Sequence, residues 1–130
     1  MNKLPSSRPE IVVNKNAVAL KAFFGIAHKW QLSSEQERVL LGTPKATYYR
    51  WKQQKDGALS QDTLERISYI LGIYKALRIL LPSEQAANAW IHKPNTAPLF
   101  SGNSALDKMM KGHVIDLADV RRYLDAERGC

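Results

Sequence analysis

A short turn between two helical segments is the feature that most constrains how this chain can fold. The segment Leu41–Trp51 reads L-G-T-P-K-A-T-Y-Y-R-W, and the helical pattern before it ends at Gly42. Glycine commonly ends a helix, and Pro44 suits a first helical position because its missing N–H would have no partner there. Thr43 is then the expected N-cap of the next helix. Two helices joined by so tight a turn predict a helix-turn-helix.

The helix after this turn is expected to have one aromatic face and several polar faces. Tyr48 and Trp51 are three residues apart, so both lie on one side and are expected to pack into the core. The remaining faces carry side chains that can contact phosphates or base edges in the DNA major groove. The candidate DNA-binding residues are Lys45, Ala46, Thr47, Tyr49, Arg50 and Lys52. The alternative is a short amphipathic helix in an ordinary helical bundle.

Positive charge is concentrated in the first half of the chain. The 130 residues carry a formal net charge of +7. Residues 1–59 hold ten Lys/Arg and four Asp/Glu (+6), whereas residues 60–130 hold nine and eight (+1). This asymmetry favours a polyanionic partner for the first half. The simpler interpretation is a solvated basic face.

The residue inventory gives little support to catalysis, to a metal site or to a membrane span. Cys130 is the only cysteine, so no intrachain disulfide and no Cys/His zinc pattern is expected. The carboxylate pairs Asp62/Glu65 and Asp116/Asp119 stand at expected helix starts, where capping and the helix dipole account for them. No stretch reaches the ~20 apolar residues of a membrane span, and no signal-peptide pattern opens the chain. We expect a cytoplasmic protein that is not an enzyme and needs no cofactor.

Helical periodicity runs through most of the chain, and no strand pattern is convincing. Residues 1–15 are expected to form a flexible arm, with a short ordered piece at residues 11–13. The expected helices, caps included, cover residues 17–30, 33–41, 43–55, 60–81, 83–91, 104–111 and 116 to near the end. Gly72 is the expected weak point of the long fourth helix. The predicted fold class is all-α.

Polar residues with capping ability mark most of these helix starts. Ser33 with Gln36, or Ser34 with Glu37, fits a capping box, in which each side chain bonds the other residue's backbone N–H. Ser60, Ser83 and Ser104 are the expected caps of later helices. Asp116 is the expected cap of the last one.

The last helix and its end form a second candidate binding surface. Residues 117–124 can anchor the helix, and beyond it Gly129 carries a short charged terminus past the fold. A solvated helix end is the default interpretation of such a tail. The alternative is a tail that inserts into a partner.

Five segments in a fixed order resemble the Xre/MbcA/ParS-type antitoxins. They are L-G-T-P-K-A-T-Y-Y-R-W (41–51), L-S-Q-D-T-L-E-R-I-S-Y-I-L-G-I-Y-K-A-L (59–77), W-I-H-K-P-N (90–95), F-S-G-N-S-A-L-D-K-M-M-K-G (100–112) and V-R-R-Y-L-D-A-E-R-G (120–129). The resemblance covers most of the chain, from about Leu40 to the end. It implies an Xre-like helix-turn-helix DNA-binding domain over residues 16–72 and a toxin-binding domain over residues 73–130.

The resemblance also implies a function. Members of this family neutralise a RES-domain toxin that degrades NAD, by placing the C-terminal segment in or over the toxin's active site, and they repress their own operon. The implied partners are a cognate RES-domain toxin and operator DNA, with a homodimer inside the toxin–antitoxin complex. The implied toxin-binding residues are Arg121, Arg122, Tyr123, Asp125, Arg128, Gly129 and Cys130.

One departure from the family and one alternative function accompany this resemblance. The family commonly ends in two glycines, whereas this chain has Gly129 followed by Cys130. The cysteine adds a side chain where a narrow pocket could require none. The alternative function is a stand-alone helix-turn-helix transcription regulator whose C-terminal part dimerises or binds a small ligand.

Overall fold

The computed structural model describes residues 14–129, which form seven α-helices and no strand beyond one isolated bridge. The helices are α1 (Lys15–Lys29), α2 (Ser34–Leu41), α3 (Lys45–Gln54), α4 (Gln61–Leu80), α5 (Glu84–Trp90), α6 (Ala105–Met109) and α7 (Val114–Glu127). The all-α prediction is confirmed. The ordered piece expected at residues 11–13, most of the expected arm, and Cys130 lie outside the described residues.

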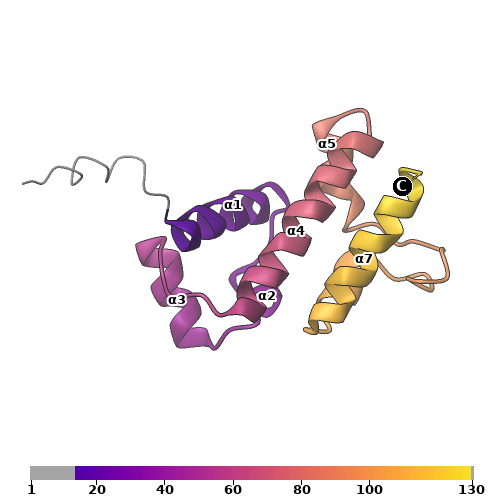
Figure 1. Ribbon diagram of the computed structural model, residues 1–130. Helices are drawn as coiled ribbons and strands as arrows, with labels where there is room; N and C mark the ends of the chain where they lie inside the picture. Colours follow the sequence, from indigo (N-terminus) through magenta and orange to yellow (C-terminus); the bar gives the residue numbers. More distant parts are fainter. Residues whose placement is uncertain (1–13, 130) are drawn as a thin grey trace, which may run out of the picture.

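Helix α4 is the element that the two halves of the molecule share (Figure 1). It packs against α1 and α2 and also against α5 and α7. Gly72 does not interrupt it, because α4 is continuous over its 20 residues. A side chain at position 72 would collide with the side chain of Arg121 in α7. Gly72 therefore allows a close approach of α7 to α4 and is not a weak point.

The structure selects Ser33 over Ser34 as the cap of α2 and confirms the three serine caps expected for later helices. Ser33 accepts a hydrogen bond from the Gln36 backbone N–H, and the Gln36 side chain accepts one from Ser33 N–H, which completes the capping box. Ser60, Ser83 and Ser104 each accept a bond from the backbone N–H three residues later. These bonds satisfy N–H groups that a helix start otherwise leaves free.

Two other expected caps are wrong. Helix α3 starts at Lys45 with Pro44 as N-cap, because the Thr43 carbonyl oxygen is held by Arg38 Nη1 at 3.1 Å and the chain stays extended through Pro44. Helix α7 starts at Val114, two residues before Asp116. Asp116 does not cap the helix, since its carboxylate lies buried within the first turn and bonds Lys108.

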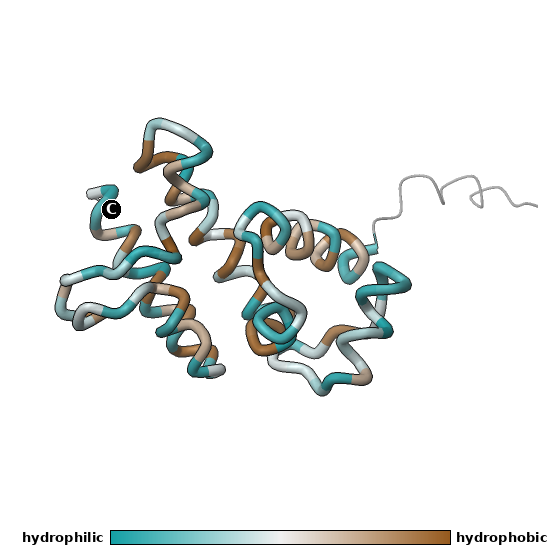
Figure 2. The backbone as a smooth tube through the Cα atoms, turned by 180° about the vertical axis from the view of Figure 1, so that it is seen from behind, coloured by the Kyte–Doolittle hydropathy of each residue, from teal (hydrophilic) through white to brown (hydrophobic). Residues whose placement is uncertain are grey.

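The apolar sides of the helices meet in one buried cluster, and Figure 2 shows hydrophobic and hydrophilic positions alternating along the helices. Tyr48 and Trp51 are 1% and 3% exposed, so their predicted packing is confirmed. Tyr48 meets Phe24 of α1 edge to face, with ring centroids 6.3 Å apart. Gly57 lies against the indole of Trp51, where any side chain would collide with it. The inner face of α3 is thus fixed to the core.

Neither a membrane span nor a metal-binding cluster is found among residues 14–129. None of their helices is both long enough and apolar enough to cross a membrane. They also contain no group of three or more His, Cys, Asp and Glu side chains that could hold a metal ion.

Candidate functional site

The turn between α2 and α3 is fixed by the backbone of Gly42. This residue adopts a left-handed conformation, with φ +64° and ψ 36°, and its N–H donates to the carbonyl oxygens of Arg38 and Val39. Glycine takes this conformation without steric penalty. A side chain at position 42 would also collide with the guanidinium of Arg66. The left-handed backbone is the constraint that favours glycine here, and a larger residue would in addition displace Arg66.

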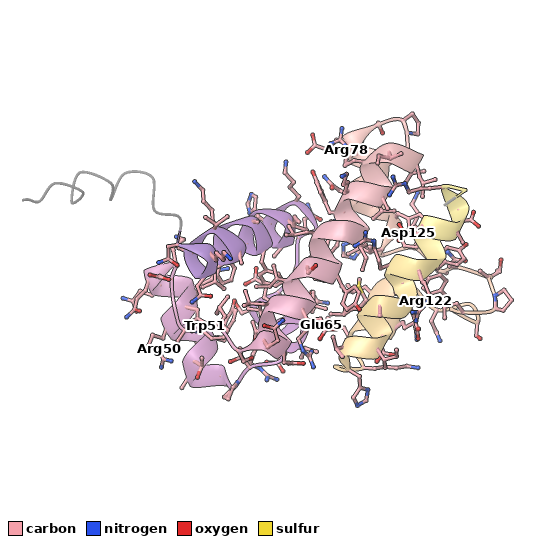
Figure 3. All side chains as sticks on the ribbon, viewed as in Figure 1. Arg50, Trp51, Glu65, Arg78, Arg122 and Asp125 are labelled. Atoms are coloured by element: carbon pink, nitrogen blue, oxygen red, sulfur yellow. The ribbon has the colours of Figure 1, made fainter. Side chains whose placement is uncertain are left out.

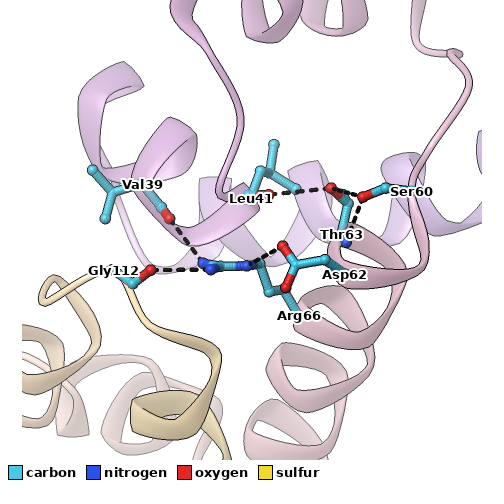
Figure 4. A network of polar contacts seen from close by, with 7 residues as sticks. All are labelled: Val39, Leu41, Ser60, Asp62, Thr63, Arg66 and Gly112. Atoms are coloured by element: carbon cyan, nitrogen blue, oxygen red, sulfur yellow. Dashed lines mark hydrogen bonds and ion pairs between the residues drawn. The ribbon is translucent and has the colours of Figure 1, made fainter.

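Arg66 of α4 ties this turn to the second half of the chain (Figure 4). Its guanidinium donates to the carbonyl oxygens of Val39 at 3.5 Å and Gly112 at 3.0 Å, and its Nε donates to Asp62 at 2.8 Å. Its side chain is 11% exposed. The role of Arg66 could not be predicted from the sequence, because its four-residue spacing from Asp62 indicates only an ordinary ion pair along a helix.

Helix α3 presents most of the candidate DNA-binding residues outward. Lys45, Ala46, Tyr49 and Arg50 are exposed, and Thr47 is half-buried. Figure 3 shows Arg50 at the outer edge of α3, away from the body of the molecule. Within residues 14–129, neither Lys45 nor Arg50 forms an ion pair. Their charges are therefore free to meet an external anion.

Lys52 is the exception among the cations of α3. Its Nζ bonds Glu37 Oε1 at 2.8 Å and lies 4.8 Å from the ring centroid of Phe24. Glu37 is 4% exposed and also accepts a hydrogen bond from the Tyr48 hydroxyl. Burial, together with this bond to the carboxylate, raises the pKa of Tyr48 to about 12. Lys52 thus neutralises a buried carboxylate, whereas its position in the sequence had predicted only a contact with DNA.

The candidate toxin-binding arginines of α7 are held by aspartates. Arg121 Nε lies 3.1 Å from Asp125 Oδ2, and Arg128 Nη1 lies 3.5 Å from Asp125 Oδ1. Arg122, on the exposed side of the helix (Figure 3), pairs with Asp119 at 2.7 Å. Arg121, Asp125 and Arg128 are only partly exposed, so the structure brings these three together and leaves Arg122 on a separate face.

The end of α7 leads directly into the candidate tail. Gly129 is exposed and left-handed, with φ +80°, and its N–H donates to the carbonyl oxygen of Ala126. No atom outside its immediate chain neighbours lies within 4 Å of where a Cβ would stand. The tail therefore starts in open space immediately after a fixed helix end.

Tyr123 belongs to an aromatic cluster that forms only in the folded chain. Its ring stacks on Trp90, with centroids 6.3 Å apart, and meets Phe100 edge to face at 5.1 Å. Such pairs add stability beyond the area that they bury. Trp90 and Phe100 lie far from Tyr123 in sequence, so no local pattern could have identified the cluster. Tyr123 fixes α7 to α5 and to the loop before α6.

A second polar cluster holds the start of α7 to α6. Lys108 Nζ lies 3.1 Å from Asp116 and 3.3 Å from Asp119. Burial alone would raise the pKa of Asp119, but hydrogen bonds from Arg122 and Lys108 outweigh it and hold the pKa below its usual value. Burial likewise lowers the pKa of Lys108 less than its two carboxylate partners raise it. The cluster joins α6 to the start of α7 through ion pairs.

Comparison with known proteins assigns the N-terminal and the C-terminal part of the chain to known domains. Residues 11–72 match the antitoxin Xre-like helix-turn-helix domain, and residues 76–129 match the antitoxin Xre/MbcA/ParS C-terminal toxin-binding domain. The chain is also 50% identical over 111 residues to the uncharacterized protein y4oB of Sinorhizobium fredii (strain NBRC 101917 / NGR234), covering 85% of this chain and 84% of that protein. The chain therefore belongs to the Xre/MbcA/ParS-type antitoxins, as a helix-turn-helix protein with a toxin-binding domain.

Proposed function

We propose that this antitoxin neutralises a NAD-degrading RES-domain toxin by covering the toxin's active site with its C-terminal segment. We further propose that it binds operator DNA through α3 and so regulates its own operon. The observation that carries both proposals is the separation of two ends of the molecule by α4: among residues 14–129, Lys45 and Arg50 of α3 form no ion pair, and the charged end of α7 lies away from α3. Both activities are binding events and need no catalytic group of this chain.

The DNA contact is proposed to follow the usual geometry of a recognition helix. Arg50 would reach base edges, and Lys45 and Thr47, in the first turn of α3, would meet phosphates near the positive end of the helix dipole. Tyr49, 49% exposed, and Ala46 would lie against the groove between them. Helix-turn-helix proteins commonly bind two half-sites as dimers, with one recognition helix in each. A homodimer is therefore the assembly that we propose on DNA.

The toxin contact is proposed to use α7 and the residues after it. A helix that is already formed loses little entropy on docking, which favours affinity. Arg122 is exposed and Arg128 stands at the helix end, so both can reach toxin carboxylates or a place shaped for the phosphates of NAD. Gly129 lacks a side chain and so suits a narrow active site, with Cys130 following it.

Co-expression and an NAD assay test this proposal. The product of the neighbouring gene should co-purify with the antitoxin, and adding the antitoxin to that purified toxin should stop NAD loss at a stoichiometric ratio. A chain that ends at Glu127 is the matched control, because it keeps α7 and lacks only the tail. If the full chain neither co-purifies with the toxin nor slows NAD loss, a stand-alone transcription regulator becomes the better account.

A further inference from the structure

A groove opens between the C-terminal ends of α4 and α7. It measures about 250 Å³ and is lined by Leu77, Leu80, Leu81, Trp90, Tyr123 and Leu124. Leu77 and Leu124 are 1% exposed and belong to the core, whereas the other four are only partly buried. Glu127 is the one charged lining residue and is exposed. The groove is thus an apolar hollow with an acidic edge.

The walls of this groove are held in place by packing outside it. Leu81 ends α4 in an extended conformation, with φ −111° and ψ 140°, and Pro82 follows it, so the helix cannot continue into the hollow. Trp90 and Tyr123 stack on each other, and both contact Phe100. A preformed hollow of this kind can accept a side chain without first reorganising, which lowers the entropic cost of binding.

The location of the groove within the toxin-binding domain indicates that its partner is the toxin. All its lining residues fall within residues 76–129, which match the toxin-binding domain. Tyr123 belongs both to the groove wall and to the candidate toxin-binding residues, and Glu127 directly precedes Arg128. Helix α3, the proposed DNA-binding helix, lies at the opposite end of the molecule (Figure 1), so the groove is not part of that surface.

We infer that this groove receives one large apolar side chain of the toxin, such as Leu, Met or Phe, and that Glu127 pairs with a Lys or Arg beside it. The inference rests on the proposed function, because it extends the toxin contact from the tail to the body of the domain. A buried apolar anchor next to a charged rim is the usual arrangement of a strong protein contact. The groove would then provide affinity, while the tail blocks the active site.

Two pairs of matched variants test the groove, with affinity for the purified toxin measured by titration calorimetry. Leu80→Glu places a charge inside the groove. Ile79→Glu places the same charge at the preceding residue, which is 55% exposed and lies outside the groove. Leu80→Glu should weaken toxin binding at least ~30-fold, the loss expected of a central contact. Ile79→Glu should change it less than about twofold, as expected of a neutral surface position.

The second pair changes charge only. Glu127→Lys should weaken toxin binding about tenfold, by replacing an attractive charge with a repulsive one. Glu65→Lys, at an exposed glutamate of α4 that does not line the groove (Figure 3), should leave toxin binding unchanged. This pair decides the question if a thermal melt shows that Leu80→Glu has unfolded the domain.

The outcomes separate the groove from the proposed function. If the groove variants bind toxin as tightly as their controls while a chain ending at Glu127 no longer stops NAD loss, the groove inference is overturned and the proposed function stands. If the unmodified chain does not bind the toxin, the proposed function itself fails.

Discussion

The two ends of this molecule handle positive charge in opposite ways. Among residues 14–129, Lys45 and Arg50 of α3 form no ion pair, whereas Arg121, Arg122 and Arg128 at the other end are all paired with aspartates. An unpaired cation can neutralise a phosphate and release a counterion without first losing an internal partner. A paired arginine instead has a fixed direction, which suits recognition of one protein surface. The difference fits a polyanion at α3 and a folded partner at α7.

The contrast is not a matter of exposure alone, because Lys52 is also exposed and is nevertheless paired with Glu37. Lys45 and Arg50 differ from Lys52 in that neither forms an ion pair within residues 14–129. The predictions below test this comparison in order of decreasing effect.

Trp51→Ala should lower the free energy of unfolding by ~3–5 kcal/mol, because it removes a large buried side chain. The loss would show that the inner face of α3 is structural and only its outer face is available for binding. Urea denaturation measures it, with Tyr49→Ala as the control. Tyr49 is 49% exposed, so its loss should change stability by less than about 0.5 kcal/mol. Equal stability of the two variants would contradict the assignment of faces.

Lys52→Met should destabilise the protein by about 1–3 kcal/mol, since it removes a charged hydrogen-bond partner from the buried Glu37. Lys55→Met, at an exposed lysine after α3, should leave stability unchanged and reduce the salt dependence of DNA binding by about one phosphate contact. Chemical denaturation and DNA titrations at several salt concentrations test the pair. A stable Lys52→Met protein with a reduced salt slope would show that Lys52 is a phosphate contact after all.

Asp125→Ala should weaken toxin binding by about 0.5–1.5 kcal/mol, because Arg121 and Arg128 lose the partner that orders them. Stability should fall by less than about 1 kcal/mol, since both pairs are partly solvated. Calorimetric titration with toxin measures the first effect and urea denaturation the second. Unchanged toxin affinity would mean that the ordering of these arginines does not matter for binding.

The smallest effect expected is the pH dependence of the stability that the ion pairs of Asp119 provide. The pKa of this carboxyl is held below its usual value, so its stabilising effect is present above the pKa of the unfolded chain and is lost as pH falls through the folded value. Asp119→Asn should therefore be less stable than the unmodified protein at pH 7, by less than about 1 kcal/mol. The difference should shrink in urea denaturations between pH 5 and pH 3. A difference that stays constant with pH would show that the charge of Asp119 contributes nothing.

Local sequence signals predicted most of the helices and failed where distant residues decide. The serines before α2, α4, α5 and α6 identified helix starts because capping depends on residues only three positions apart. The start of α7 was predicted wrongly because Asp116 is bound by Lys108 of another helix. The role of Gly72 was also wrong, since its reason lies in the approach of Arg121.

The residues of the candidate site also divide into those that local sequence could predict and those that it could not. The faces of α3 follow from helical spacing, so the burial of Tyr48 and Trp51 could be predicted. The pairing of Lys52 could not, because it requires the crossing of α2 and α3 that buries Glu37. The aromatic cluster around Tyr123 likewise depends on tertiary packing alone.

The most direct test of two separable ends is to measure two variants in two assays each. Arg50→Ala should weaken binding to the operon's own upstream DNA by ~1–3 kcal/mol and leave inhibition of the toxin unchanged. A chain that ends at Glu127 should show the reverse, with normal DNA binding and no protection of NAD. If either variant impairs both activities while its thermal melt is unchanged, the two ends do not act separately and the account is contradicted.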